Sequence, residues 1–402
     1  MDFPLKIFFF LTVLFVYVLF NFEYFKDVSK LEAYQRFSTS KCHLLNGTQR
    51  FAPMEDLKLV TPNIAIGAAS SLASFYEHGD KIDPLGNIIA FDLTTERLKV
   101  LSLNDFPHLV VFRPHGIHYS ERTKRLFVVN HANNGEERIE IFSVKHLEDL
   151  EALEIQWIDF LNPPGGKGVV NSVTEVSDKQ IYLTHSLPYP IPEGGMLHPE
   201  SFQQFLQLLW GSGVFWKALG LPPHLVGSTY VFFCDIETKR CGKLPAKFIS
   251  ANGIGSSADG SLLFVADTMR QTLTVFEKQN RNALAIEDEE AVKWKVKKIE
   301  ILPHTVDNLQ VVSLGNHKFE IWMGTSPDLI KTLKSISVGN VTAPGGFSKG
   351  LYDETTNKLE VEDILIHDGS FLSGTSSSIA WKNQIVFSSP KTPGVLICSC
   401  CD

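Results

Sequence analysis

The hydrophobic residues of this chain gather in short runs that alternate with polar turns. From Asn63 onward these runs are rich in β-branched and aromatic side chains and are bounded by Gly, Asp, Asn or Lys. Such a pattern is typical of short β-strands separated by tight turns. The predicted strands cover residues 87–93, 125–130, 139–144, 180–185, 229–233, 261–266, 273–276, 319–323, 378–381 and 384–388.

The arrangement of these strands favours one fold class. Strands do not alternate with regular helices, which disfavours a doubly wound parallel sheet. A sandwich needs only about a hundred residues per copy, and no Pro-, Ser- or Gly-rich linker separates two such domains. Strand clusters recur at roughly 40–60 residues, the spacing of propeller blades. We predict an all-β fold, a six-bladed β-propeller over residues 42–402.

One segment departs from the strand pattern. Between Pro188 and His224 the apolar residues recur largely at helical spacing. This spacing predicts a helical insertion over about 188–224. Either the insertion packs on the propeller as a lid, or it presents a hydrophobic surface to a membrane or a partner protein.

A long apolar run occupies the N-terminus. Residues 7–20 are apolar except for Thr12, Lys6 precedes them, and charged residues return at Glu23. No small residues of a cleavage site follow, which disfavours a cleaved signal peptide, and a terminal apolar run is an unusual core helix. We predict an uncleaved signal-anchor that spans the membrane (1–25) and a juxtamembrane segment (26–41).

The charge next to this run predicts its orientation. Lys6 lies on the short side, which favours a cytosolic N-terminus. The propeller is then expected to be luminal or extracellular, in the endoplasmic reticulum or at the cell surface. Secretion is the alternative.

Composition narrows the classes of partner. The chain has 402 residues, of which 44% are hydrophobic and 20% charged, values that are ordinary for a folded protein. Its net charge is -8, and no basic stripe is present. Because phosphate backbones attract basic surfaces, nucleic acid is not an expected partner.

The cysteines agree with an oxidising compartment. Cys42 could form a bridge to one of three terminal cysteines and so join the two ends of the domain. The three candidates are Cys398, Cys400 and Cys401. Across a predicted hairpin, Cys234 and Cys241 could also pair.

Two Asn-x-Thr triplets, at Asn46 and Asn340, match the N-glycosylation signal. Such triplets also arise by chance, so they add little on their own. They are consistent with a luminal or extracellular propeller.

Five scattered side chains carry the oxygen ligands that calcium prefers. Singly, each is an ordinary turn residue, because Asn and Asp tolerate the left-handed backbone and bond their own main chain. Together they supply two carboxylates and three amides, which balance one divalent cation if a ring gathers them. These residues are Glu55, Asn171, Asn252, Asp307 and Asn308.

Two histidines arise at adjacent strand ends, where a propeller places residues at the mouth of its channel. His115 lies in an Arg-Pro-His-Gly-Ile-His sequence, and His131 follows the strand at 125–130. A single histidine in such a place is more often structural. A pair at a channel mouth can accept and relay a proton near neutral pH.

Several motifs, weak singly but specific in their order and spacing, carry a family resemblance. They are Glu55-Asp56-Leu57, Pro114-His115-Gly116-Ile117, Val128-Val129-Asn130-His131, Asn171, Ala251-Asn252-Gly253-Ile254, Asp259-Gly260, Val306-Asp307-Asn308 and Cys398. From about Cys42 to Cys398 the chain resembles the paraoxonase/arylesterase family of calcium-dependent six-bladed propellers. An uncleaved hydrophobic N-terminus is also a common feature of that family.

This resemblance implies a catalytic calcium held by the five oxygen-bearing residues named above. The calcium would act as a Lewis acid on a carbonyl or phosphoryl oxygen. His115 would be the base that activates water, with His131 as its partner. The terminal cysteine of the family pattern is Cys398, the implied partner of Cys42.

A second, structural calcium is also implied by the resemblance. Its ligands would be Asp56, the main-chain carbonyl of Ile117, and an Asp directly after the first ligand Asn. This chain has Ser172 at that last position. Loss of a carboxylate weakens a calcium site, so we expect the second ion to be weak or absent.

The leading hypothesis is therefore a hydrolase of small-molecule aryl esters or lactones. The alternative is a non-enzymatic, membrane-anchored accessory or folding factor for a degenerin-type sodium channel subunit, suggested by the anchor, the altered second site and the apolar insertion. A related lactonase or strictosidine-synthase-like propeller is disfavoured by the Asp307-Asn308 pair together with His115 and His131.

Overall fold

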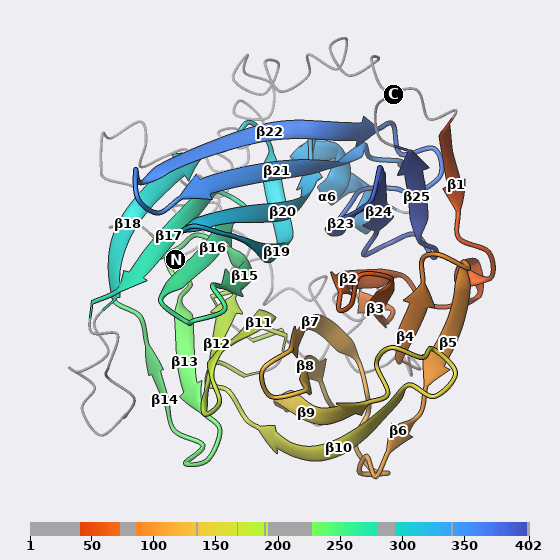
Figure 1. The fold of residues 1–402 in the computed structure, drawn as a ribbon, viewed down its shortest axis with the longest axis horizontal. Helices are drawn as coiled ribbons and strands as arrows, with labels where there is room; N and C mark the ends of the chain where they lie inside the picture. The colour runs from red at the N-terminus through yellow and green to blue at the C-terminus, as the bar shows by residue number, and fades with distance from the viewer. Residues whose placement is uncertain are drawn as a thin grey trace, which may run out of the picture.

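The structure is a computed structural model that describes residues 41–72, 86–133, 136–166, 168–188, 190–191, 227–279, 294–338 and 341–399. Within these residues the strands form six sheets. The sheets stand around a common axis as the blades of a propeller (Figure 1). This arrangement confirms the predicted six-bladed, nearly all-β fold.

The first three blades follow one another along the chain. From the axis outward, the first contains β2 (Met54–Leu59), β3 (Ile64–Ala69), β4 (Asn87–Asp92) and β5 (Arg97–Leu101). The second contains β7 (Pro114–Ser120), β8 (Arg125–His131), β9 (Glu137–Lys145), β10 (Glu154–Leu161) and β6 (Leu103–Asn104). The third contains β11 (Val170–Ser177), β12 (Gln180–His185), β13 (Val231–Asp235) and β14 (Cys241–Lys243).

The last three blades complete the ring. Again from the axis outward, the fourth contains β15 (Ala251–Ser256), β16 (Leu262–Asp267), β17 (Thr272–Lys278) and β18 (Trp294–Ile301). The fifth contains β19 (Thr305–Gly315), β20 (Lys318–Ser326), β21 (Gly345–Asp353) and β22 (Lys358–His367). The sixth contains β23 (Ser377–Trp381), β24 (Gln384–Ser388), β25 (Leu396–Ser399) and β1 (Cys42–Leu44).

Burial explains why the middle strands form continuous apolar runs in the sequence. Every residue of β3, β12 and β16 is buried, because neighbouring blades cover both faces of these strands. The outer strands differ. In β18 only Trp294 is buried, and the residues after it are half-buried or exposed. The strongest strand signals in the sequence therefore come from the middle of each blade.

The sixth blade is built from both ends of the chain. β1 pairs antiparallel with β25, and Cys42 lies directly opposite Cys398 in that register. A disulfide joins these two cysteines, which are 356 residues apart in sequence. A second disulfide joins Cys234 to Cys241 across the β13–β14 hairpin. Of the three terminal cysteines that the sequence left open as partners of Cys42, the structure pairs it with Cys398.

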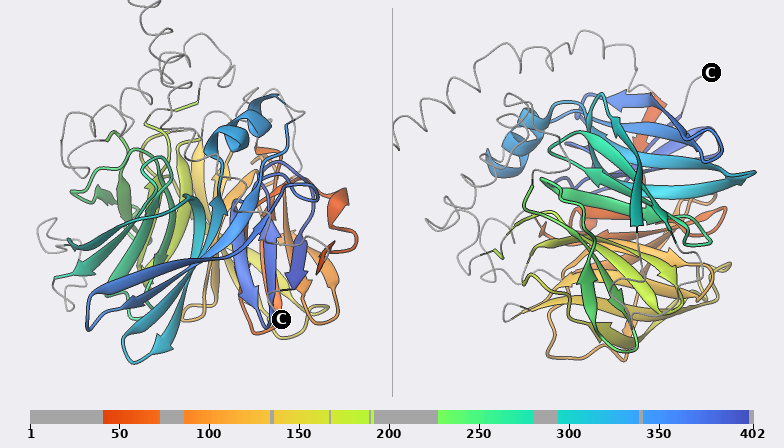
Figure 2. Two further views of the ribbon diagram at one scale, coloured as in Figure 1. Left: turned by 90° about the horizontal axis from the view of Figure 1, so that it is seen from above. Right: turned by 90° about the vertical axis from the view of Figure 1, so that its left-hand side faces the viewer.

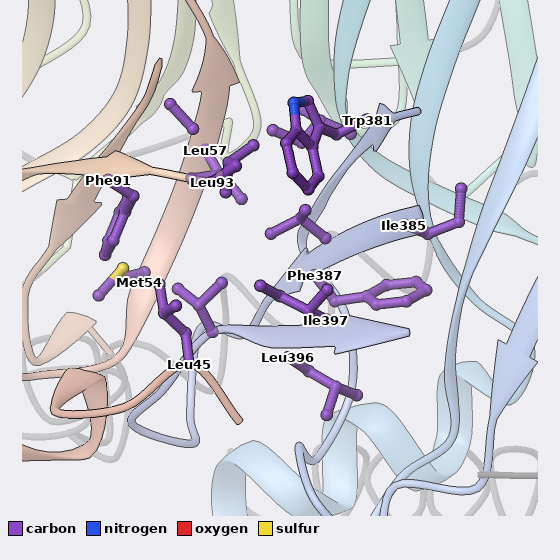
Figure 3. Close-up of a cluster of buried hydrophobic side chains, with 14 of the residues drawn as sticks. Leu45, Met54, Leu57, Phe91, Leu93, Trp381, Ile385, Phe387, Leu396 and Ile397 are labelled. Carbon is purple, nitrogen blue, oxygen red and sulfur yellow. The ribbon is translucent and has the colours of Figure 1, made fainter. Parts of the chain in front are cut away.

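Packing between the first and sixth blades reinforces this closure. Figure 3 shows Met54 and Phe91 of the first blade and Leu396 and Ile397 of the sixth within one buried cluster. The indole Nε1 of Trp381 also donates a hydrogen bond of 2.9 Å to the main-chain oxygen of Pro62. The blades at the two ends of the chain thus share one hydrophobic core.

One helix was not predicted from the sequence. Helix α6 (Leu329–Val338) connects β20 to β21, and the carboxylate of Asp328 caps it by accepting a hydrogen bond from the amide of Lys331 at 2.9 Å. Figure 2 shows α6 at one open end of the ring. A short 3-10 helix, η4 (Thr48–Arg50), follows β1.

Some expectations concern residues outside this description. The predicted signal-anchor (1–25), nearly all of the juxtamembrane segment (26–41), most of the helical insertion and Asn340 lie there. Among the residues that are described, no helix is long and apolar enough to cross a membrane. The anchor and the insertion stay predictions.

We predict that the ring-closing disulfide contributes more to stability than the hairpin disulfide. Replacing Cys42 and Cys398 by Ser should lower the free energy of unfolding by roughly 2–4 kcal/mol, because this cross-link restricts the unfolded chain over most of its length. Chemical unfolding followed by circular dichroism measures the loss. The matched control replaces Cys234 and Cys241 by Ser, and an equal loss in that variant would contradict the prediction.

Candidate functional site

Five of the six innermost strands lose their regular pairing within their first residues. The register shifts between Met54 and Asp56, Pro114 and Ile117, Val170 and Val173, Ala251 and Ile254, and Val306 and Leu309. The sixth innermost strand, β23, pairs regularly with β24. A β-bulge turns a side chain away from its usual alternation and re-aims it. The five irregularities contain Glu55, His115, Asn171, Asn252, and the pair Asp307 and Asn308.

Two glycines allow these bulged strands to approach one another. A Cβ atom on Gly116 would lie 2.3 Å from the main-chain oxygen of Asn171, and one on Gly253 would lie 2.4 Å from that of Asp307. Any larger residue would push the neighbouring blades apart at these points. The glycines of the His-Gly and Asn-Gly pairs therefore have a structural role beside the site residues.

The predicted oxygen ligands come together at this end of the axis. The Nδ2 of Asn308 donates to Glu55 Oε1 at 2.7 Å. His115 Nε2 lies 3.3 Å from the same Glu55 oxygen and 3.3 Å from the Nδ2 of Asn171. On the remaining side, the Asn252 side chain is hydrogen-bonded to Asp307.

The sixth blade supports the site without adding a ligand. The Ser376 hydroxyl donates to the main-chain oxygen of Glu55 at 2.5 Å. Its main-chain oxygen accepts a hydrogen bond from the Asn308 amide at 2.9 Å. Ser376 therefore holds two ligand-bearing segments, from β2 and β19, next to each other.

Each predicted ligand has one buried oxygen with no hydrogen-bond partner among the described residues. A buried acceptor left unpaired costs free energy, and such atoms are rare in native proteins. Here five belong to side chains that meet at the axis, which is the environment of a hard cation with oxygen ligands. The residues fit calcium on this ground. The oxygens are Glu55 Oε2, Asn171 Oδ1, Asn252 Oδ1, Asp307 Oδ1 and Asn308 Oδ1.

The charges at the site also favour a cation. Burial, together with the nearby carboxylate of Glu55, raises the pKa of Asp307 well above its usual value. The buried carboxylate of Glu55 and the half-buried carboxylate of Asp307 repel each other unless a positive charge lies between them. The described residues contain no group of three or more His, Cys, Asp or Glu side chains that could hold a metal ion. This set instead combines two carboxylates with three amides.

The two predicted histidines are in contact, and a third residue completes their chain. His115 Nδ1 lies 2.8 Å from His131 Nε2, and His131 Nδ1 lies 2.9 Å from Glu137 Oε2. All three side chains are buried. Glu137 is held in turn by the amides of Gly168 and Val170, at 2.8 and 2.9 Å.

Sequence reasoning missed Glu137, although one signal was present. Glu137 follows His131 by six residues, and the β8–β9 hairpin places the two directly opposite each other. A carboxylate across a hairpin from a buried histidine is a recurrent way to orient an imidazole.

Burial acts against protonation of both histidines, but their neighbours differ. Burial lowers the pKa of His131 despite the attraction of Glu137. For His115, burial is outweighed by the carboxylate of Glu55, and the pKa is raised. The neutral form is therefore favoured at His131, and His115 is the more basic imidazole of the pair.

The residues expected to hold a second cation are arranged differently. Asp56 is fully buried beside Ile117 and accepts the Ile117 amide hydrogen on Oδ2 at 2.9 Å. Its Oδ1 accepts from the Lys58 ammonium at 2.8 Å. The main chain of Ser172 packs against Gly116, and its hydroxyl has no partner among the described residues.

Lys58 is the second residue that sequence reasoning missed. It is buried, and it comes two positions after Asp56 on β2. Lysine at a strand position normally marks a solvent-facing side chain, so the hydrophobic pattern offered no reason to place it at the axis.

The predicted glycosylation site at Asn46 is exposed, between β1 and η4. Its modification stays a prediction. Asn340 lies outside the described ranges.

Comparison with known proteins supplies several relatives over most of the chain. Serum paraoxonase/arylesterase 2 of Homo sapiens is 25% identical over 350 residues, which cover 86% of this chain and 85% of the relative. The Rattus norvegicus protein of the same name is 26% identical over 353 residues, with the same coverage. Serum paraoxonase/lactonase 3 of Homo sapiens is 25% identical over 354 residues, again covering 86% and 85%. No protein-family model matches the chain.

The unpaired oxygens at the axis predict calcium binding that can be measured without an activity. Calcium at a hundred times its dissociation constant should stabilise the folded state by about 2.7 kcal/mol and raise the melting temperature. Glu55→Gln should abolish most of this increase, because it removes one of two carboxylates. Scanning calorimetry with and without chelator provides the measurement.

The control for this experiment is Glu360→Gln, which changes an exposed acid on β22. That variant should respond to calcium as the unmodified protein does. A calcium-dependent increase that survives in Glu55→Gln would rule out the proposed ligand set.

Proposed function

We propose that this chain, a member of the paraoxonase-like family, is a calcium-dependent hydrolase of aryl esters or lactones. Its curated relatives are named paraoxonase, arylesterase and lactonase, which supports a hydrolase family. The observation that carries the finer proposal is the set of five buried oxygens without partners, beside a pair of histidines. An oxygen-lined cation site next to a base is one arrangement that can catalyse hydrolysis of a carbonyl ester.

Glu55, Asn171, Asn252, Asp307 and Asn308 would hold the calcium ion. When bound there, calcium polarises the carbonyl oxygen of a substrate and stabilises the negative charge that develops on it. The two carboxylates of this set match the charge of the ion, and the three neutral amides complete the oxygen ligands without adding charge.

The hydrogen-bond chain determines which nitrogen can act as the base. The Glu137 carboxylate only accepts hydrogen bonds, so the proton of His131 lies on Nδ1 and its Nε2 is an acceptor. His131 Nε2 then accepts from His115 Nδ1. The lone pair of His115 is thereby left on Nε2, which can accept a hydrogen bond from the Asn171 Nδ2 at 3.3 Å.

His115 Nε2 would take a proton from a water molecule as the water oxygen forms a bond to the carbonyl carbon. The imidazolium formed is stabilised through His131 by Glu137. That proton then passes to the leaving oxygen as its bond to the carbonyl carbon breaks. Glu137 is a positioning residue in this scheme, since it acts only through His131.

We also propose that the propeller is luminal or extracellular and is tethered by the predicted signal-anchor at residues 1–25. The two disulfides support an oxidising compartment. A membrane-tethered protein of this kind would meet small apolar esters and lactones that partition into lipid.

The hydrolase proposal predicts calcium-dependent turnover. A propeller expressed without residues 1–40 should hydrolyse phenyl acetate or an aliphatic lactone in calcium, and excess chelator should abolish the rate reversibly. Release of phenol or of acid measures it. Absence of calcium-dependent turnover on both substrate classes would contradict the enzyme proposal. It would favour the alternative, an accessory factor for a degenerin-type sodium channel.

A second prediction concerns the proton relay. His115→Gln should lower kcat by roughly 10²–10⁴-fold, the usual contribution of a general base. Its melting temperature and calcium affinity should be retained, because the glutamine side chain can still hydrogen-bond to His131.

Glu137→Gln tests the positioning role separately. The amide introduced by this substitution can donate a hydrogen bond, so the preferred tautomer of His131 is no longer fixed, and we expect a smaller loss of kcat with a shifted pH profile. If His115→Gln leaves kcat intact, the base assignment is wrong. If Glu137→Gln leaves the pH profile unchanged, the relay ends at His131.

A further inference from the structure

A buried lysine lies at the axis, near the site already described. Lys58 is 6% exposed, and the Asp56 carboxylate next to it is fully buried. Its ammonium group donates to Asp56 Oδ1 at 2.8 Å and to the main-chain oxygen of Leu309 at 2.9 Å. Lysine is almost never buried unless it is paired, because removing an ammonium ion from water is costly. A specific role must therefore compensate for its burial.

The partners of Lys58 connect two blades. Asp56 and Lys58 belong to β2 of the first blade, and Leu309 belongs to β19 of the fifth. Asp56 also accepts the amide hydrogen of Ile117, on β7 of the second blade. One ion pair therefore ties three blades together at the axis. Structural calcium ions perform the same task by collecting oxygen ligands from separate segments.

The carboxylate of Asp56 has no free acceptor that resembles those of the five calcium ligands. Its Oδ1 accepts from Lys58 and from the Leu57 amide at 2.8 Å, and its Oδ2 accepts from Ile117. By contrast, each of the five ligands keeps a buried oxygen without a partner among the described residues. Hydrogen-bond donors of the protein itself therefore occupy both oxygens of the Asp56 carboxylate.

The charge balance excludes a second divalent ion from this position. A serine, Ser172, stands where the family resemblance expects an aspartate, and its main chain packs on Gly116, next to Ile117. One carboxylate and one ammonium already sum to zero. A calcium ion beside Lys58 would meet an ammonium at close range with only one carboxylate to offset it. The residues present do not fit a second calcium.

We propose that the ammonium group of Lys58 takes the place of the structural calcium. The internal ion pair Lys58–Asp56 then holds the first, second and fifth blades together without a metal. Calcium would be needed for the first site alone, and the ring would stay folded when calcium is removed. This inference does not depend on any hydrolytic activity.

The number of calcium ions bound tests the proposal. Lys58→Met combined with Ser172→Asp removes the ammonium and supplies a second carboxylate next to the Gly116–Ile117 segment that binds Asp56. This double variant should bind one calcium ion more per chain than the unmodified protein, by equilibrium dialysis with atomic emission. An equal count in the two proteins would overturn the proposal.

Two further variants keep the result interpretable. Ser172→Asp alone retains Lys58 and should bind no additional ion, so an additional ion in that variant would also overturn the proposal. Glu55→Gln in each background subtracts the ion of the first site. The increment caused by the double substitution should survive this subtraction, which separates a failure of this proposal from a failure of the first calcium site.

Stability in chelator provides the second readout. Lys58→Met alone leaves Asp56 buried without its cation, and its melting temperature in chelator should be roughly 5–10 °C below that of the unmodified protein. The double variant should recover this difference when calcium is added. If Lys58→Met melts with the unmodified protein in chelator, the ion pair does not hold the blades and the proposal fails.

Discussion

Buried negative charge at the axis is the constraint on which this propeller depends. The carboxylates of Glu55, Asp56 and Asp307 all lie on inner strands at the axis, and burial raises the pKa of Asp56 and of Asp307. A ring fold brings these charges together because every blade places its innermost strand at the axis. The carboxylates remain ionised only if positive charge accompanies them. Positive charge can come from two sources at the axis. One is a cation bound by the five oxygen ligands, and the other is the ammonium group of Lys58.

The oxygen ligands could be predicted from the sequence more readily than the residues around them. Asn252 and Asp307 could be predicted because amides and acids beside glycine or a second amide are conspicuous between apolar strands. Their convergence could be predicted because blade-length spacing implies a ring. The bulges that aim them could not, because inner strands such as β2, β11 and β15 are buried on both faces and show no alternation that a bulge would interrupt.

The residues that the sequence did not reveal share a physical reason. Lys58 and Glu137 are charged, and charge in a short strand or beside a turn normally indicates solvent. Only the three-dimensional partners, Asp56 for one and His131 for the other, make their burial possible. Helix α6 was missed for a related reason, since it is a short helix with an Asp cap in a chain dominated by strand signals.

The closure of the ring by both chain ends has a consequence for biosynthesis. Within the described residues β1 pairs with β25 alone, and Ser376, which steadies Glu55 and Asn308, comes just before the three strands β23, β24 and β25. At ~5–20 residues per second, roughly 20–70 s separate the synthesis of the two strands. During that interval Cys42 has no partner, and the emerging chain exposes an unfinished sheet edge to the thiol oxidants and chaperones around it. Closure of the ring must therefore wait until the strands of all six blades have been synthesised, which makes it a late step in the folding of the propeller.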